Sequence, residues 1–314
     1  MTTVLIYDDR FLDHDTGPGH PERPDRLRAV KQHLQSAGLW ERLTHLTFEP
    51  ADMRWILANH DQAYVERLRD ACNSGAAFID AMDSAICTAT FDIARLAAGG
   101  VLRAVDAVMT GEADNVFCAM RPPGHHAEQD RSMGFCMFNN VAIAARYAIE
   151  QYVLERVAIV DFDVHHGNGT QHSFEDRTDV LFISLHEDPE SLYPGTGFVH
   201  EAGTGQGAGF TLNMPFEPGA DDDRYDTVFN EQVIPKLDAF APQLVLISAG
   251  FDAAASDPLA HQQLTPDCFA RMTCALCDVA DRHCNGKLVS TLEGGYDLNS
   301  LAACVGAHLK SLAG

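Results

Sequence analysis

Short apolar runs recur along the chain, and most of them are rich in valine, isoleucine and leucine. Runs of this length and composition, bounded by glycine, proline or aspartate, indicate buried β-strands. We therefore predict strands at residues 3–7, 115–119, 156–161, 180–185, 244–249 and 287–292.

Between these runs, apolar residues recur every three or four positions, which is the spacing of amphipathic helices. Buried strands that alternate with such helices indicate a parallel sheet covered on both faces. No internal repeat or Ser/Gly linker divides the chain, so we predict one α/β domain over residues 1–314, with the glycine-rich stretch 201–210 as a loop. The helices are expected near residues 25–37, 61–72, 88–110, 139–151, 222–240, 266–283 and 299–312.

The balance of charge narrows the choice of partners. The 314 residues include 22 basic and 45 acidic side chains, for a formal net charge of −23. This charge repels phosphate backbones and anionic lipid, so we expect no direct nucleic-acid partner and no membrane association, whereas a cationic partner would be attracted. Nine scattered cysteines and an amino terminus without a secretion signal favour reduced thiols in the cytoplasm.

One cysteine pair has the spacing of a metal motif. Cys274 and Cys277 form a CxxC within "CFARMTCALCDVADRH". In the same segment Phe269, Met272 and Leu276 follow helical spacing, which is typical of a packed amphipathic helix. We interpret the segment as a helix, and a zinc knuckle is the alternative.

The stretch "VDFDVHHGNGTQ" at residues 160–171 carries the first candidate chemistry. Asp161, Asp163 and His165 alternate at the end of a predicted buried strand, so they leave it on one side. Two carboxylates and an imidazole are ligands suited to zinc, with ferrous iron as the second choice. A hydrogen-bonded strand end is the alternative, but two carboxylates buried without a counter-charge would be costly.

Three other predicted strands are also followed by side chains that can bind a metal ion or transfer a proton. Asp252 follows the strand in "LVLISAGFDA", His125 and His126 follow two prolines in "RPPGHH", and Tyr296 follows two glycines in "LEGGYDL". Ligands of open parallel sheets bind beyond the carboxyl ends of the strands. We therefore expect these side chains to meet, with three of them holding a metal ion that keeps an open position, as catalytic zinc requires.

At this point the motifs resemble those of the zinc-dependent histone deacetylases, and most closely the class II branch. The resemblance runs in family order over nearly the whole chain and implies the arginase/deacetylase fold, with an eight-stranded parallel sheet between helices. The motifs that carry it are "GHPERPDRL" (19–27), "RPPGHHAEQD" (121–130), "GFCMFNN" (134–140), "DFDVHHGNGTQHSFED" (161–176), "SAGFDA" (248–253) and "LEGGYDL" (292–298).

The resemblance implies a role for each candidate residue. It assigns the zinc ligands to Asp163, His165 and Asp252. It also implies that His126 is the general base and Tyr296 the electrophilic hydroxyl.

The resemblance further implies that His125 is oriented by Asp161. Asn168 stands where class I relatives have an aspartate facing the second histidine, and asparagine there is the class II pattern. On this reading the chain is a deacetylase that hydrolyses the amide of acetyl-lysine or a related acyl-lysine.

The resemblance also predicts a tunnel for the acyl-lysine side chain. Phe135 and Tyr193 match its aromatic walls, with Gly134 alongside. Asp83 or Ser84 is the candidate to hold the substrate backbone.

A structural potassium ion is implied as well. Its ligands would come from the strand end that carries the zinc ligands and from the next strand, at Asp161, Asp163, His165, Ser184 and Leu185.

Three further interpretations compete with an acyl-lysine deacetylase. An acetylpolyamine amidohydrolase would be favoured by an acidic residue near Leu259, where leucine favours acyl-lysine in peptides or proteins. A zinc-holding reader of acyl-lysine without turnover would be favoured by the loss of His126 or Tyr296, and both are present. An arginase-like enzyme with two manganese ions would need further Asp and His ligands, and position 168 is asparagine.

Overall fold

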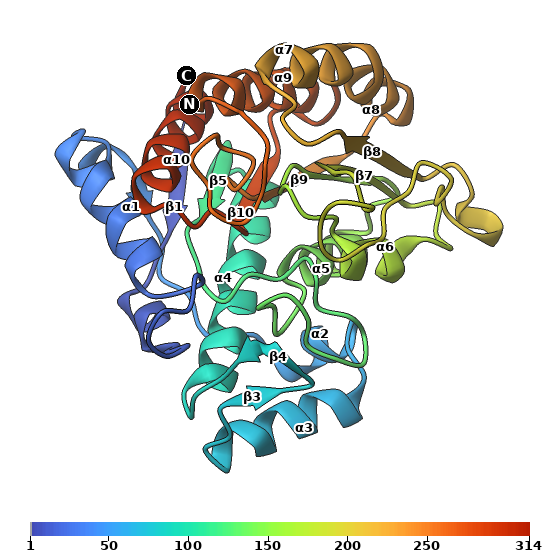
Figure 1. Ribbon diagram of the computed structural model, residues 1–314. Helices are drawn as coiled ribbons and strands as arrows, with labels where there is room; N and C mark the ends of the chain where they lie inside the picture. The colour runs from blue at the N-terminus through green and yellow to red at the C-terminus, as the bar shows by residue number, and fades with distance from the viewer. Residues whose placement is uncertain (1) are drawn as a thin grey trace.

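The computed structural model describes residues 2–314; Met1, the first residue of the predicted domain, lies outside the described residues. The chain folds into an α/β domain around an eight-stranded, all-parallel sheet in the order β2-β1-β5-β10-β9-β6-β7-β8 (Figure 1). The strands are β1 (Thr3–Ile6), β2 (Thr44–His45), β5 (Asn115–Cys118), β6 (Val157–Asp161), β7 (Val180–Glu187), β8 (Thr211–Phe216), β9 (Leu244–Ala249) and β10 (Leu288–Leu292).

Helices cover both faces of this sheet (Figure 1). One layer packs around α9 and α10, and the other packs around α4 and α5. The first layer holds α1 (Asp25–Ser36), α7 (Asp222–Val228), α8 (Ile234–Phe240), α9 (Pro266–Cys284) and α10 (Leu298–Ala313). The second holds α2 (Met53–Leu57), α3 (Gln62–Asn73), α4 (Thr90–Thr110), α5 (Asn140–Tyr152) and α6 (Asn168–Phe174).

The remaining elements are short. A two-stranded antiparallel hairpin, β3 (Phe78–Ile79) and β4 (Ala81–Ala85), lies outside the main sheet. Single 3₁₀ turns occupy Asp9–Asp13, Trp40–Arg42 and Gly205–Gly207, the last of these inside the predicted glycine-rich loop. Among residues 2–314, no helix has both the length and the apolarity needed to cross a bilayer.

The sheet core explains why the apolar runs were visible in the sequence. The strands β5, β6, β9 and β10 are buried at every position, because helices cover both of their faces. The six predicted strands all form, with bounds shifted by a few residues at most.

The strands and α-helices that were not predicted are short or lie at an edge of the sheet: β2, β3, β4, β8, α2 and α6. The strand β2 has only two residues, and the edge strand β8 contains Pro215, which an edge position tolerates because its missing N–H need not pair. The helix predicted over 222–240 forms without interruption, but a π-helical turn at Phe229–Val233 lies between its α-helical segments α7 and α8. Pro235 in the first turn of α8 lacks an N–H to donate to the preceding turn, which favours a local change in the hydrogen-bonding pattern.

Candidate active site

The four strand ends that carry candidate chemistry belong to four neighbouring strands. The order β5-β10-β9-β6 in the middle of the sheet brings their carboxyl ends to one edge. The register aligns Asp161 of β6 with Ser248 of β9, and Leu292 of β10 with Ala249 of β9. The segments that follow these strands therefore start side by side, although they come from distant parts of the sequence.

Asp163, His165 and Asp252 form a compact group of donor atoms. The Nδ1 atom of His165 lies 3.0 Å from Oδ1 of Asp163 and 3.2 Å from Oδ2 of Asp252. One possible ligand atom from each of the three residues lies within 4.8 Å of the others. Backbone N–H groups hold the carboxylates in place: Gly294 donates to Asp163 at 2.8 Å and Val164 donates to Asp252 at 2.9 Å.

The shape and charge of this group fit a divalent cation. A Cβ atom on Gly294 would come within 2.0 Å of Asp252 Oδ2, and one on Gly250 would come within 2.1 Å of Asp163 Oδ2, so both glycines make room for the carboxylates. Burial disfavours a charged imidazole, but the two carboxylates outweigh it and raise the pKa of His165 to about 10. The group therefore favours positive charge, and its donor set of two carboxylates and one imidazole suits zinc.

The side chain of Asp161 turns away from this group. Its Oδ2 accepts a hydrogen bond from Nδ1 of His125 at 2.9 Å. Burial disfavours the charged imidazole of His125, but Asp161 and Asp163 outweigh it and raise its pKa to about 10. Of the three alternating residues, two thus face the metal-binding group and one orients a histidine.

His126 has a different environment from His125. Its Nδ1 donates to Oδ1 of Asn168 at 2.7 Å, and the centroids of the two histidine rings are 4.0 Å apart. Burial, together with the positive charges of His125 and His165, holds the pKa of His126 well below its usual value. One histidine of the pair therefore favours the charged form and the other the neutral form, in which a ring nitrogen can accept a proton.

Tyr296 reaches the same point from the loop after β10. Its backbone N–H donates to Oδ2 of Asp257 at 2.6 Å, and the guanidinium of Arg26 lies 5.0 Å from its ring centroid. Burial raises the pKa of Tyr296 well above its usual value, so the hydroxyl keeps its proton at neutral pH.

These side chains line one pocket of about 260 Å³. Phe135 and Tyr193 both line it, and the ring centroid of Tyr193 lies 5.2 Å from that of His126. Gly134 has a φ of +54°, and a Cβ atom there would come within 2.3 Å of the His126 ring, so this position requires glycine. The lining residues are Asp83, His126, Gly134, Phe135, His165, Leu192, Tyr193, Leu259 and Tyr296.

The two candidates for the substrate backbone occupy different positions. Asp83 lines the pocket, where its carboxylate accepts from the Tyr193 hydroxyl at 3.3 Å. Ser84 is fully buried, and its hydroxyl donates to Oδ1 of Asp83 at 3.1 Å, so it supports Asp83 and does not line the pocket. Leu259 lies in the lining, as does Leu192, which the sequence did not single out.

Of the residues proposed to hold a monovalent cation, Asp163 and His165 belong to the metal-binding group, and the other three lie at the end of β6 and in the neighbouring strand β7. Asp161 at the end of β6 pairs in register with Ser184 of β7, and Leu185 follows in the same strand. The Ser184 hydroxyl is hydrogen-bonded to Nδ1 of His186 at 2.8 Å.

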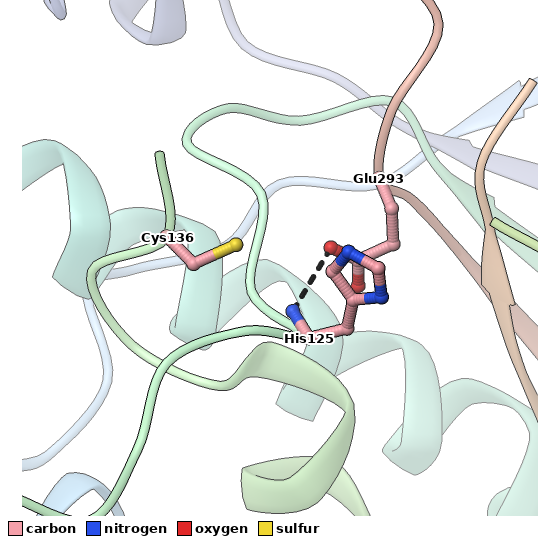
Figure 2. A group of neighbouring side chains, drawn as sticks. All are labelled: His125, Cys136 and Glu293. Atoms are coloured by element: carbon pink, nitrogen blue, oxygen red, sulfur yellow. Dashed lines mark hydrogen bonds between the residues drawn. The ribbon is translucent and has the colours of Figure 1, made fainter. Parts of the chain in front are cut away.

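A second buried cluster, His125, Cys136 and Glu293, was not recognised from the sequence (Figure 2). Oε2 of Glu293 accepts from the backbone N–H groups of Gly124 at 2.6 Å and His125 at 3.1 Å. Burial raises the pKa of Glu293 to about 7. Because Nδ1 of His125 is already bonded to Asp161, we assign Glu293 the structural task of holding the loop that carries the two histidines.

A buried ionic cluster supports the loop that bears Tyr296. Arg26 donates to the carbonyl oxygens of Gly295 and Glu293, at 2.7 and 2.5 Å, and Glu22 pairs with both Arg26 and Arg121. The side chains of Glu22, Arg26 and Arg121 have no exposed surface. The motif "HPERPDRL" (20–27) thus supports the loop that carries Tyr296 and does not line the pocket.

The CxxC pair is part of a helix, as interpreted from its spacing. Cys274 and Cys277 lie in α9, the first exposed and the second half-buried. Across residues 2–314, the two groups of side chains with closely spaced metal-ligand atoms do not include these cysteines.

The chain is similar to known proteins in both sequence and fold. The histone deacetylase domain matches residues 20–312. The chain is 40% identical to a histone deacetylase-like amidohydrolase of Pseudomonas aeruginosa, over 99% of this chain and 86% of that protein, and 40% identical to the polyamine deacetylase HDAC10 of Homo sapiens, over all of this chain and 48% of that protein. The solved HDA15 HD domain superposes with a TM-score of 0.95 at 39% identity, covering 99% of this chain and 89% of that one.

Proposed function

The chain belongs to the histone deacetylase family and is a hydrolase of that family, and from this premise we propose that it hydrolyses the ε-amide of acylated lysine in peptides or proteins. The observation that carries the proposal is the pocket itself, which is lined by His126, His165 and Tyr296 together with aromatic side chains. A neutral acyl-lysine side chain suits apolar aromatic walls, because it carries no charge until its amide is cleaved.

The proposed metal ligands are Asp163, His165 and Asp252, which would hold zinc or, as the second choice, ferrous iron. A bound ion of this kind polarises an amide carbonyl and lowers the pKa of water toward about 7. A potassium ion near Ser184 and Leu185 remains part of the proposal as a structural ion.

The protein side chains would divide the proton transfers between them. His126 would accept a proton from the attacking water at Nε2, since its Nδ1 is occupied by Asn168. A positioned base of this kind contributes roughly 10²–10⁴ in rate. The protonated His126 could then return the proton to the leaving lysine nitrogen, while His125 and Asp161 would stay charged beside it.

The hydroxyl of Tyr296 would act on the carbonyl oxygen. Negative charge develops on this oxygen when water adds to the amide, and the protonated hydroxyl can donate a hydrogen bond to it. Asp83 in the pocket lining would accept hydrogen bonds from the substrate backbone. Because both His126 and Tyr296 are in the pocket lining, an enzyme is favoured over a reader without turnover.

A panel of acetyl-lysine peptides and acetylpolyamines tests the proposal, with zinc-loaded wild type and Tyr296→Phe. We expect wild type to cleave the peptides with a higher kcat/KM than acetylspermidine. The variant should lose about 10²–10³ in kcat while it still binds the peptides, because one donor to the oxyanion is removed. Equal turnover by Tyr296→Phe on every substrate would refute this mechanism.

The same panel separates the acyl-lysine assignment from the polyamine alternative, which the human relative represents by name. Leu259 lines the pocket, and Leu259→Glu would add a carboxylate that can attract the remote ammonium of a polyamine. We expect this variant to shift the kcat/KM ratio toward acetylspermidine. A wild-type preference for acetylspermidine would instead establish the polyamine assignment.

A further inference from the structure

A hydrogen-bonded chain of side chains leads from His126 to the protein surface. Asn168 is the first residue of α6, and His172 lies one turn later on the same helix. Glu128 lies two residues after His126 in the loop that follows β5. The side chains of Asn168 and Glu128 are buried, whereas that of His172 is 42% exposed.

The contacts along this chain are short and continuous. Nδ1 of His126 donates to Oδ1 of Asn168 at 2.7 Å, and Nδ2 of Asn168 donates to Oε1 of Glu128 at 2.6 Å. Nδ1 of His172 donates to both carboxylate oxygens of Glu128 at 2.9 Å. The amide nitrogen of Asn168 also lies 3.3 Å from the carbonyl oxygen of His126, which agrees with the same orientation of the amide.

The direction of these hydrogen bonds follows from the chemistry of the groups. An ionised carboxylate only accepts, so Asn168 must turn its NH₂ group toward Glu128. Its oxygen then faces His126, and this oxygen also only accepts, so Nδ1 of His126 must carry the hydrogen. The other ring nitrogen, Nε2, is left with a free lone pair on the side of the pocket.

We propose that Glu128 is a positioning residue, which fixes the orientation of the Asn168 amide and through it holds His126 in the tautomer whose Nε2 can accept a proton. His125 is bonded directly to the carboxylate of Asp161, whereas His126 is connected to a carboxylate only through this amide. An amide alone could present either its oxygen or its NH₂ group, and Glu128 removes that ambiguity.

The surroundings of Glu128 keep it in place and charged. Its backbone N–H donates to the carbonyl oxygen of Arg131 at 3.0 Å, and its own carbonyl oxygen accepts from Nδ1 of His60 at 2.8 Å. Burial raises the pKa of Glu128, but the hydrogen bonds from His172 and Asn168 outweigh it and lower the pKa overall. Glu128 therefore acts as an acceptor at neutral pH.

The inference rests on the proposed function of His126, and the experiment uses the zinc-loaded enzyme with Glu128→Leu and Glu128→Gln. Leucine removes the acceptor, so we expect kcat on an acetyl-lysine peptide to fall about 10- to 100-fold, as when the supporting partner of an active-site ligand is removed. Glutamine can still accept from Asn168 with its side-chain oxygen, so its kcat should stay within about threefold of wild type.

A spectroscopic measurement distinguishes positioning from a general loss of structure. Nitrogen-15 NMR of histidine-labelled protein reports which ring nitrogen is protonated, and comparison with His126→Gln identifies the His126 signals. Wild type and Glu128→Gln should show Nδ1 protonated and Nε2 free. In Glu128→Leu the NH₂ group of Asn168 keeps only its longer contacts, such as that with the His126 carbonyl oxygen at 3.3 Å, so the amide can turn and the other tautomer should appear.

The matched control is the pair formed by His283 and Asp238, a histidine–carboxylate contact of 2.8 Å between α9 and α8. His283→Gln should leave kcat and the His126 signals unchanged. Wild-type kcat together with an unchanged tautomer in Glu128→Leu would overturn the inference, as would an equal loss in Glu128→Gln with the same melting temperature. Absence of turnover by wild type on every acyl amide would instead contradict the proposed function, and the NMR result would still decide the role of Glu128.

Discussion

The alternating residues at the carboxyl edge of the sheet have different roles, and their spacing in the sequence does not show which residue has which role. Asp161, Asp163 and His165 alternate along the chain, yet Asp161 bonds to His125 and the other two face Asp252. The strand β6 ends at Asp161, so the backbone after it is free to turn the side chains of Asp163 and His165 toward another point. The alternation therefore predicted the cluster, and the division of tasks came only from the family resemblance.

Two glutamates of the site lie inside family motifs, Glu128 in 121–130 and Glu293 in 292–298, but their roles could not be assigned from the sequence. Glu293 accepts from Gly124, a residue 169 positions earlier, and Asn168 donates to Glu128 across 40 positions. Such acceptors depend on segments that meet only in the folded molecule. Because glutamates usually lie at the surface, the sequence does not show which partners these two meet until that packing is known.

At the residue scale, Gly294→Ala tests the tight fit around the metal-binding group. The added Cβ would come within 2.0 Å of Asp252 Oδ2 and 2.6 Å of Asp163 Oδ2, so both carboxylates must move. We expect zinc affinity to fall about 10- to 100-fold, measured by competition with a chelator.

Gly306→Ala in α10 is the matched control. The added Cβ would meet the far end of the His33 side chain, with Nε2 at 2.7 Å, and this flexible side chain can move. Zinc affinity of this variant should equal that of wild type. Unchanged affinity in Gly294→Ala would show that the glycine is not needed for the fit.

At the scale of elements, six of the eight strands and the layer arrangement could be predicted, because buried strands have continuous apolar runs. The strand β2 is too short to leave such a run, and β8 has polar residues and a proline at the edge. The helix over 222–240 was predicted at its full length, but the π-helical turn inside it, next to Pro235, leaves no trace in the apolar spacing.

An ionic cluster joins α1 to the loop after β10. We predict that Glu22→Gln, which removes the charge of its carboxylate, lowers the stability of the protein. Burial raises the pKa of Glu22, but Arg121 and Arg26 outweigh it and lower the pKa from 4.5 to about 2. Since the folded pKa lies below the unfolded one, the contribution of Glu22 is fully present above about pH 4.5 and is lost as the pH falls toward 2.

We therefore expect Glu22→Gln to lower the free energy of unfolding by about 3–5 kcal/mol at pH 7, because it leaves two buried guanidinium groups without their charge partner. Urea unfolding between pH 3 and pH 7 should show the difference from wild type shrinking toward the acid end. Glu112→Gln, which breaks the exposed pair with Arg103, should change stability by less than about 1 kcal/mol. A constant difference across the pH range would contradict the account.

At the scale of the whole molecule, the net charge of −23 acts on any charged substrate. An acidic protein attracts cationic peptides over a distance set by the Debye length, which is about 10 Å at 0.1 M salt. We expect kcat/KM for a lysine-rich acetylated peptide to fall about 3- to 10-fold between low and high salt. A neutral acetyl-lysine peptide is the control and should change by less than about twofold; equal salt dependence for both would exclude steering by the net charge.

The carboxylate of Asp257 connects two segments of the pocket wall. One of its carboxylate oxygens accepts from the N–H of Tyr296 at 2.6 Å, and the other accepts from the N–H of Leu259 at 3.0 Å. Leu259 and Tyr296, which both line the pocket, are thus held through their backbones by the same carboxylate. A change in the backbone at residues 257–259 that alters substrate selectivity will therefore also move the Tyr296 hydroxyl. Selectivity and turnover are coupled in this fold, and neither can be changed there without the other.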